Sequence, residues 1–165
     1  MMRIVHVNTS DHYGGAARAA YRLHSGLKKA GVDSMMVVQK KGTRAHDIYS
    51  NETKAGKLAA KIRPYIDHLP LTLSNFKTGH NFSPAIVPGQ TVKGINHIHP
   101  DIVNLHWIAQ GFIRIEALKG LRQKPVVWTL HDSWAFTGGC HLPYTCTAYQ
   151  ERCGKCPILG SKSDY

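Results

Sequence analysis

The sequence predicts an α/β domain with a mostly parallel β-sheet. Three observations lead to this fold class. Short apolar runs alternate along the chain with longer segments of helical periodicity. Glycine and proline separate these segments, and no run of about 18 apolar residues occurs. The 165 residues are 42% hydrophobic and 19% charged, which is typical of one globular domain over residues 1–165 and excludes a disordered chain.

The N-terminal part of the chain has the order strand, turn, helix, strand. Residues 3–8 have the apolar pattern of a strand buried on both faces, and a polar turn with Gly14 and Gly15 follows. Residues 16–30 are rich in good helix formers, and residues 33–39 form a second apolar run. This order predicts a β-α-β unit with a right-handed crossover. The apolar residues at helical spacing are Ala16, Ala20, Leu23 and Leu27.

The rest of the chain continues this alternation less regularly. Residues 40–52 are predicted as a loop, and residues 54–69 as a helix that Pro64 kinks or splits. Residues 70–100 contain four prolines and are predicted to be irregular, with one short strand or helix. The later predicted elements are a strand at 101–107, a helix at 113–121 and a strand at 125–131, the last with the clearest strand pattern.

The chain is strongly basic. It has 21 Lys and Arg against 10 Asp and Glu, which gives a formal net charge of +11 at pH 7, and residues 1–82 carry +8 of this charge. Such a charge favours polyanionic partners, namely nucleic acid, anionic lipid or phosphorylated small molecules. A role in solubility alone stays open.

The predicted helix at 54–69 has a basic side and an apolar side. Two interpretations remain: the apolar side packs on the sheet, which we favour, or it lies on an anionic membrane surface. The N-terminus does not have the pattern of a signal peptide, so we expect a cytoplasmic protein. Under the second interpretation it binds peripherally to the inner face of the cytoplasmic membrane. The basic residues of this helix are Lys54, Lys57, Lys61 and Arg63.

Polar and aromatic residues stand where three predicted strands end. They are Asn8 on the first strand, His106 and Trp107 on the 101–107 strand, and His131 and Asp132 on the 125–131 strand. Because ligands of open α/β sheets bind outside the carboxyl ends of the strands, these side chains are predicted to converge on one crevice. A purely structural, hydrogen-bonded His131 remains the alternative.

The turn at Gly14 and Gly15 follows a strand and opens a helix. A helix N-terminus offers unpaired N–H groups and partial positive charge, and glycine allows close approach of a phosphate. The turn is therefore a candidate phosphate site, with a plain tight turn as the alternative. The chain has neither the G-x-G-x-x-G fingerprint nor a P-loop.

All four cysteines lie in the last 26 residues, with the spacing C-x5-C-x6-C-x2-C. Four thiolates can form a closed, tetrahedral structural zinc site, and His141 is a possible replacement for Cys140 in it. Free thiols and, less favoured in a reducing compartment, disulfides stay open as alternatives. The predicted ligands are Cys140, Cys146, Cys153 and Cys156.

Taken together, these motifs resemble the N-terminal domain of a family 4 glycosyltransferase with the GT-B architecture, in the bacterial subgroup that assembles extracellular polysaccharides such as colanic acid. The resemblance implies a Rossmann-like, three-layer α/β/α domain that forms the acceptor-side half of a GT-B fold. The matching segments are IVHVNTSD at 4–11, GGAARAAYRLH at 14–24, NLHWI at 104–108, VVWTLHDSWAFTGGCH at 126–141 and CGKCP at 153–157.

The resemblance also implies an activity: transfer of a sugar, with retention, from a nucleotide-sugar donor to a saccharide or lipid-linked acceptor. In such enzymes Gly14 and Gly15 approach the donor diphosphate, and His131, with Asp132 beside it, faces the transferred sugar. No cofactor is required for catalysis, so any zinc is structural. As a hypothesis, Trp107 and Trp134 offer faces to the acceptor, next to Asn8 and His106.

The chain departs from the family in one respect. The two glutamates, seven residues apart, of the donor-binding domain are not present, and neither is that C-terminal domain. We therefore expect residues 1–165, with their Cys-rich loop at 138–157, to be inactive alone.

Two other functions have weaker support in the sequence. A zinc-containing nucleic-acid-binding module would explain the charge and the cysteines, but the basic residues are not interleaved with aromatic ones. A dinucleotide-dependent oxidoreductase lacks support, because the glycine fingerprint is missing and Gln39, Lys40 and Lys41 stand where an acidic residue is needed.

Overall fold

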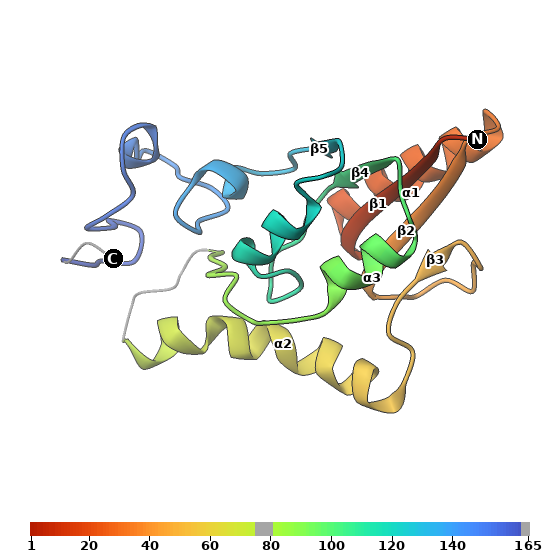
Figure 1. The fold of residues 1–165 in the computed structure, drawn as a ribbon. Helices are drawn as coiled ribbons and strands as arrows, with labels where there is room; N and C mark the ends of the chain where they lie inside the picture. The colour runs from red at the N-terminus through yellow and green to blue at the C-terminus, as the bar shows by residue number, and fades with distance from the viewer. Residues whose placement is uncertain (75–80, 163–165) are drawn as a thin grey trace.

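A computed structural model describes residues 1–74 and 81–162 of the chain, and the fold is built around a five-stranded, all-parallel sheet (Figure 1). The strand order is β3-β2-β1-β4-β5. The predicted α/β, Rossmann-like class with a parallel sheet is confirmed. The strands are β1 (Arg3–Ser10), β2 (Asp33–Lys40), β3 (Ile48–Tyr49), β4 (Ile102–Leu105) and β5 (Val126–Trp128).

Helical elements cover both faces of the sheet. On β2, Met36 and Val38 share a core with Ala20, whereas Met35 and Val37 pack into the larger core around Ile95. This two-residue alternation on a strand buried from both sides produces the predicted three layers. The helices are α1 (Gly15–Lys29), α2 (Lys54–Leu73) and α3 (Thr91–His97), and the 3-10 helices are η1 (Ile115–Leu121), η2 (Trp134–Phe136) and η3 (Ala148–Gln150).

The chain direction across the sheet reverses between β1 and β4. From β1 the chain moves outward through β2 to β3, and it then returns to the other side of β1 to add β4 and β5. Such a switch point opens a crevice at the carboxyl ends of the two central strands. Here those ends are joined by hydrogen bonds from the Thr9 N–H to the Trp107 carbonyl at 2.8 Å and from the His106 N–H to the Val7 carbonyl at 2.9 Å.

Helix α1 packs on the sheet through a face that only partly matches its predicted apolar one, since Ala20 is buried and Ala16 and Leu27 are half-buried. Its buried residues are Ala17, Ala20 and His24, whereas Leu23 is exposed. Alanines let the helix approach the strands closely, and the His24 ring lies 2.8 Å from the Ser34 hydroxyl of β2. A buried hydrogen bond to the strand therefore decides the orientation of the helix.

Helix α2 is longer than predicted, and neither proline splits it. It runs from Lys54 to Leu73 through Pro64 and Pro70 (Figure 1). Each proline removes one N–H donor, yet the helical pattern continues on both sides. No helix in the described part of the chain is long and apolar enough to span a membrane.

The strand at 125–131 is shorter and more exposed than its sequence suggests. Only residues 126–128 pair, with β4, and Val126 and Val127 are 43% and 52% exposed. Strand β5 is the edge of the described sheet, so its apolar pattern does not produce burial.

Other predicted elements need smaller corrections. The 101–107 strand pairs only over residues 102–105, and the helix at 113–121 is a 3-10 helix that begins at Ile115. The loop at 40–52 contains β3, and the irregular 70–100 segment contains the end of α2 and α3. Residues 75–80 of that segment lie outside the described residues.

Candidate functional site

Three imidazole rings form a line from the core to the carboxyl edge of the sheet. His6 Nδ1 lies 3.1 Å from His106 Nε2, and His106 Nδ1 lies 3.0 Å from His131 Nε2. His6 and His106 are 0% and 3% exposed, whereas His131 is half-buried at the edge. The histidine chain (His6, His106 and His131) therefore fixes the ring of His131 from inside the protein.

The two inner rings of the histidine chain are neutral at physiological pH. Burial lowers the pKa of His6 to about 4, with a contribution from the charge of His24. Burial, together with the charges of His6 and His131, lowers the pKa of His106 to about 3. Burial also lowers the pKa of His131, against the opposing effect of Asp132. A neutral imidazole has one N–H donor and one acceptor nitrogen. Each hydrogen bond of the histidine chain therefore depends on the tautomer of the next ring.

We expect acid to destabilise the protein through this histidine chain. In the unfolded chain both inner rings take up protons below about pH 6.5, whereas in the folded chain they do so only near pH 4 and 3. The unfolded state thus binds more protons in this window. The contribution of the two rings to the free energy of unfolding is fully present above about pH 7. It falls on acidification by up to about 1.4 kcal/mol per pH unit for each ring.

Urea unfolding followed between about pH 7 and pH 5 measures this slope. The variant H106Q, which removes one titrating ring, should show a shallower slope than the wild type. A flat profile for the wild type would show that the rings titrate normally in the folded protein.

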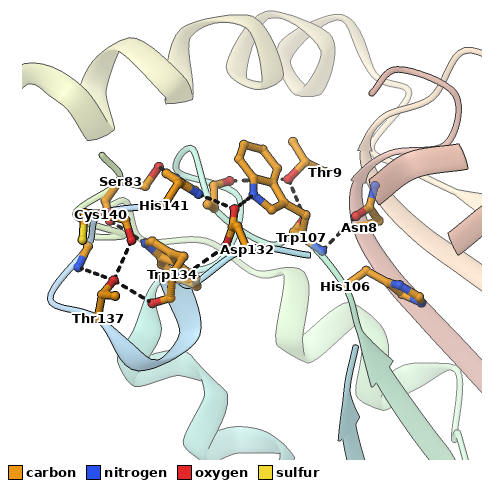
Figure 2. Close-up of polar contacts among 12 residues, drawn as sticks. Asn8, Thr9, Ser83, His106, Trp107, Asp132, Trp134, Thr137, Cys140 and His141 are labelled. Carbon is orange, nitrogen blue, oxygen red and sulfur yellow. Dashed lines mark hydrogen bonds and ion pairs between the residues drawn. The ribbon is translucent and has the colours of Figure 1, made fainter. Parts of the chain in front are cut away.

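Asp132 is the centre of a dense hydrogen-bond network (Figure 2). Its carboxylate accepts from Trp107 Nε1 at 2.7 Å, from His141 Nδ1 at 2.6 Å and from the Trp134 N–H at 2.9 Å. Burial alone would raise the pKa of Asp132, but the hydrogen bonds from His141, Trp134 and Trp107 outweigh it and lower the pKa. Asp132 is therefore ionised, and both of its carboxylate oxygens already accept hydrogen bonds from the residues it anchors.

Ser83, His141 and Asp132 are arranged in the order of a hydrolytic triad, but they form a structural clasp. The Ser83 hydroxyl lies 2.9 Å from His141 Nε2. Ser83 and His141 are 3% and 5% exposed, and the His141 ring stacks on Trp134. A nucleophile with this burial has no access to a substrate. The clasp holds residues 81–83 against residues 139–141. The Ser83 N–H donates to the Gly139 carbonyl, and the His141 N–H donates to the Asn81 carbonyl.

The loop between β1 and α1 is fixed by a second buried carboxylate. Asp11, 1% exposed, accepts from the N–H groups of Gly42 and Thr43 at 2.8 and 2.9 Å. Burial would raise its pKa, but hydrogen bonds from Thr43, His12 and Gly42 hold the pKa at about 2. These bonds connect the segments that follow β1 and β2, and Asp11 lies three residues before Gly14 in the glycine turn.

Comparison with known proteins identifies the family of this domain. The family model for Glycosyltransferase Family 4 matches residues 13–153, which is most of the chain. The chain belongs to glycosyltransferase family 4. It is also 26% identical over 164 residues to the "Putative colanic acid biosynthesis glycosyl transferase WcaC" of Escherichia coli (strain K12). That alignment covers 97% of this chain but only 40% of the relative. No solved structure matches the chain.

The glycine turn of this family 4 domain is open. Gly14 precedes α1 with φ 93°, a conformation that favours glycine, and no side chain in the described residues caps the helix. A Cβ at Gly14 or Gly15 would meet no described atom within 4 Å. Described side chains therefore do not crowd the two glycines, and phosphate binding there stays a prediction.

The predicted acceptor residues line the edge but are mostly engaged with one another. Asn8 is buried, and its side chain bonds to the Trp107 N–H and the Ser10 carbonyl. Trp134 is 7% exposed and donates to the Ser83 carbonyl. Trp107 is half-buried, with its indole N–H on Asp132. Their contact with an acceptor stays a prediction.

The cavities of this family 4 domain differ greatly in size. The hollow at the edge, which His106, Trp107, His131, Asp132 and Trp134 line with others, has a volume of about 10 Å³. A cavity of about 560 Å³ lies elsewhere, between α2, α3 and the ends of β2 and β3. The described residues at this edge therefore form only a shallow hollow, and substrate binding there stays a prediction.

The four cysteines line one cavity of about 240 Å³. All four are free thiols. Burial raises the pKa of Cys140, and the charges of Cys156 and Cys153 raise it further. Among residues 1–74 and 81–162, however, no three His, Cys, Asp or Glu side chains are arranged to hold a metal ion. Zinc binding by Cys140, Cys146, Cys153 and Cys156 stays a prediction.

His141, the possible replacement for Cys140 in a zinc site, has other partners in the structure. Both of its ring nitrogens are engaged, one with Asp132 and one with Ser83. Sequence analysis also missed Ser83 and the place of His6 in the histidine chain. The only sequence signal was a polar residue within an apolar strand, because the partner of His6 lies 100 residues away.

Proposed function

We propose that this chain is the N-terminal, acceptor-side domain of a retaining, GT-B glycosyltransferase of polysaccharide biosynthesis. The reaction is transfer of a sugar from a nucleotide-sugar donor to a saccharide or lipid-linked acceptor. The observation that carries this proposal is the family 4 match over residues 13–153. The contact of His131 with His106, which follows β4 at the switch point of the sheet, supports it.

The predicted residues around the donor and the transferred sugar have distinct roles in this proposal. His131 hydrogen-bonds the transferred sugar, and the histidine chain orients its ring. Gly14 and Gly15, with the N-terminus of α1, stabilise the donor diphosphate. Asp132 acts by holding Trp107 and His141, and thus positions the edge instead of exchanging a proton. Catalysis needs no metal or cofactor, and a zinc ion held by the cysteines would be structural.

The proposal includes a second domain. The chain spans 40% of the length of the E. coli relative. We propose that the donor-binding half of the enzyme is encoded beyond residue 165, and that residues 1–165 alone are inactive because the cleft is incomplete. The enzyme acts in the cytoplasm, at the inner face of the cytoplasmic membrane.

The test begins with the gene. Reading the frame past the codon for Tyr165 should reveal a second α/β domain with paired glutamates. The full-length protein, incubated with a panel of nucleotide sugars and the cell's lipid-linked saccharides, should release nucleoside diphosphate, and residues 1–165 should not. A folded full-length protein that releases none, but binds single-stranded RNA at submicromolar concentration in about 200 mM salt, would replace the proposal with a nucleic-acid-binding module.

A further inference from the structure

The large cavity between α2, α3 and the sheet contains a buried carboxamide without a partner. Gln39, near the carboxyl end of β2, is 9% exposed and lines this cavity of about 560 Å³. Neither its side-chain oxygen nor its side-chain nitrogen has a hydrogen-bond partner among the described residues. Buried polar groups in proteins are nearly always paired, because an unpaired one lowers stability. The carboxamide of Gln39 therefore marks the cavity as a candidate binding site.

The alternation of β2 decides which way Gln39 points. Met35 and Val37, at alternate positions before it, pack into the larger core, so Gln39 faces the same side of the sheet. Residues of α2 and α3 line the cavity on that side. His6 is in register with Met36, which packs on the opposite side with α1. The cavity is therefore separate from the histidine chain.

The cavity offers no free charge to a ligand. Among the described residues that line it, the one charged side chain is Arg63 of α2. Its guanidinium donates to the carbonyls of Gly111 at 2.6 Å, Pro88 at 2.8 Å and Val87 at 3.1 Å. All three guanidinium nitrogens are thus committed to the backbone. Because a buried phosphate or carboxylate needs a cation to pair with, the cavity favours an uncharged ligand.

The rest of the lining combines apolar walls with neutral polar groups. Ile98 and Phe112 contribute apolar surface, and Ser50, Gln90 and Thr91 contribute hydroxyl and amide groups. A sugar ring has a matching composition, with apolar C–H faces and several hydroxyls that each donate and accept. Two neighbouring hydroxyls fit one carboxamide, because each partner presents a donor beside an acceptor. The volume also lies within the range of about 300–1,000 Å³ that small-molecule sites have.

We propose that this cavity is a secondary saccharide-binding site, in which Gln39 pairs with two neighbouring hydroxyls of an uncharged sugar unit. The source of the saccharide rests on the proposed function: the site holds sugar units of the acceptor away from its reacting end. No bond is made or broken in the cavity, so Gln39 determines specificity and is not a catalytic residue. Binding of such remote units contributes to positioning the reacting end.

NMR titration of the isotope-labelled 165-residue chain tests the proposal. The probes are four neutral disaccharides, namely maltose, cellobiose, lactose and mannobiose, with glucose 6-phosphate as the anionic probe and uridine as the nucleobase probe. At least one disaccharide should shift the side-chain amide signal of Gln39 in a saturable way. Glucose 6-phosphate and uridine should bind at least about tenfold more weakly. Q39L should weaken disaccharide binding by about tenfold or more, because both hydrogen bonds are lost.

Thermal unfolding of the free protein separates a ligand-binding carboxamide from a structural one. Q39L replaces two unpaired polar atoms by an apolar group of similar size, so the melting temperature should stay equal or rise. A60L, at a buried lining position of α2, fills the cavity and should abolish disaccharide binding without lowering the melting temperature. Q123L, at an exposed glutamine outside this cavity, is the matched control and should bind like the wild type.

Four outcomes would overturn the proposal. The first is no saturable binding of any disaccharide, and the second is equal affinity in Q39L and the wild type. The third is tighter binding of uridine or glucose 6-phosphate, which would assign the cavity to a nucleobase or an anion. The fourth is a lower melting temperature in Q39L, which would give Gln39 a structural role.

The full-length product provides the last check. If it binds no disaccharide where residues 1–165 do, another part of the protein fills the cavity and the proposal is also wrong. Release of nucleoside diphosphate is measured separately. A protein that transfers sugar but does not bind at Gln39 contradicts this inference alone, and one that binds but does not transfer contradicts the proposed function alone.

Discussion

Replacing His131 by alanine in the full-length protein is expected to lower kcat by about 10²-fold or more. The reason lies in the geometry of the ring. Its Nε2 lies 3.0 Å from His106 Nδ1, so under the proposed function Nδ1 is the nitrogen that bonds a substrate hydroxyl. The neutral inner rings preorganise His131, so the substrate interaction needs no reorientation in the transition state.

Steady-state rates of nucleoside diphosphate release, at saturating donor and acceptor, measure this effect. H131Q retains a hydrogen-bonding side chain and should recover part of the rate. H46A, at an exposed histidine in the loop after β2, serves as the matched control and should leave kcat unchanged. An unchanged kcat in H131A would remove His131 from the site.

Loss of the Asp132 carboxylate has the largest expected effect on stability. In D132A, Trp107, His141 and the Trp134 N–H all lose the acceptor they share at 2.6–2.9 Å. Hydrogen bonds to an ionised group contribute about 1.5–3 kcal/mol each, but the three act on one site and are not additive. We therefore expect D132A to lower the free energy of unfolding by about 3–4 kcal/mol.

Urea unfolding at neutral pH measures this loss, and D132N should show a smaller one because its amide keeps one acceptor oxygen. E151Q, at an exposed carboxylate after η3, should change stability by less than about 0.5 kcal/mol. The segment around Gly139 should also become sensitive to proteolysis in D132A, since the clasp with His141 opens. A loss below about 1 kcal/mol would show that Asp132 does not anchor this region.

The elements that the sequence predicts well are those with local causes. The first β-α-β unit follows from an apolar run, a glycine turn and a run of helix formers, and its boundaries differ from the structure by at most two residues. The carboxyl-edge rule also places His106 and His131 in one region before any coordinates are known, and the two rings are in hydrogen-bond contact.

The largest errors concern which side of an element is covered. The sequence favours packing of the apolar side of α2 on the sheet, yet Leu58 is more than half exposed, and Val127 of β5 is more than half exposed in spite of its clear strand pattern. Periodicity shows that a helix has an apolar side, but not which way that side points. For α2 the direction is set by Arg63 and Asp67, whose partners lie 18 to 49 residues further along the chain.

By itself the sequence determined the fold class, the family resemblance and the strand ends at which the candidate site lies, because these depend on neighbouring residues and on general rules of chain topology. Only the tertiary structure decided the roles within the site. His6 joins His106 across 100 residues, and Ser83 joins His141 across 58. Register and burial over such separations come from packing the whole chain. In that packing Asp132 holds Trp107 and His141 by hydrogen bonds, and His131 is the half-buried ring at the edge of the sheet.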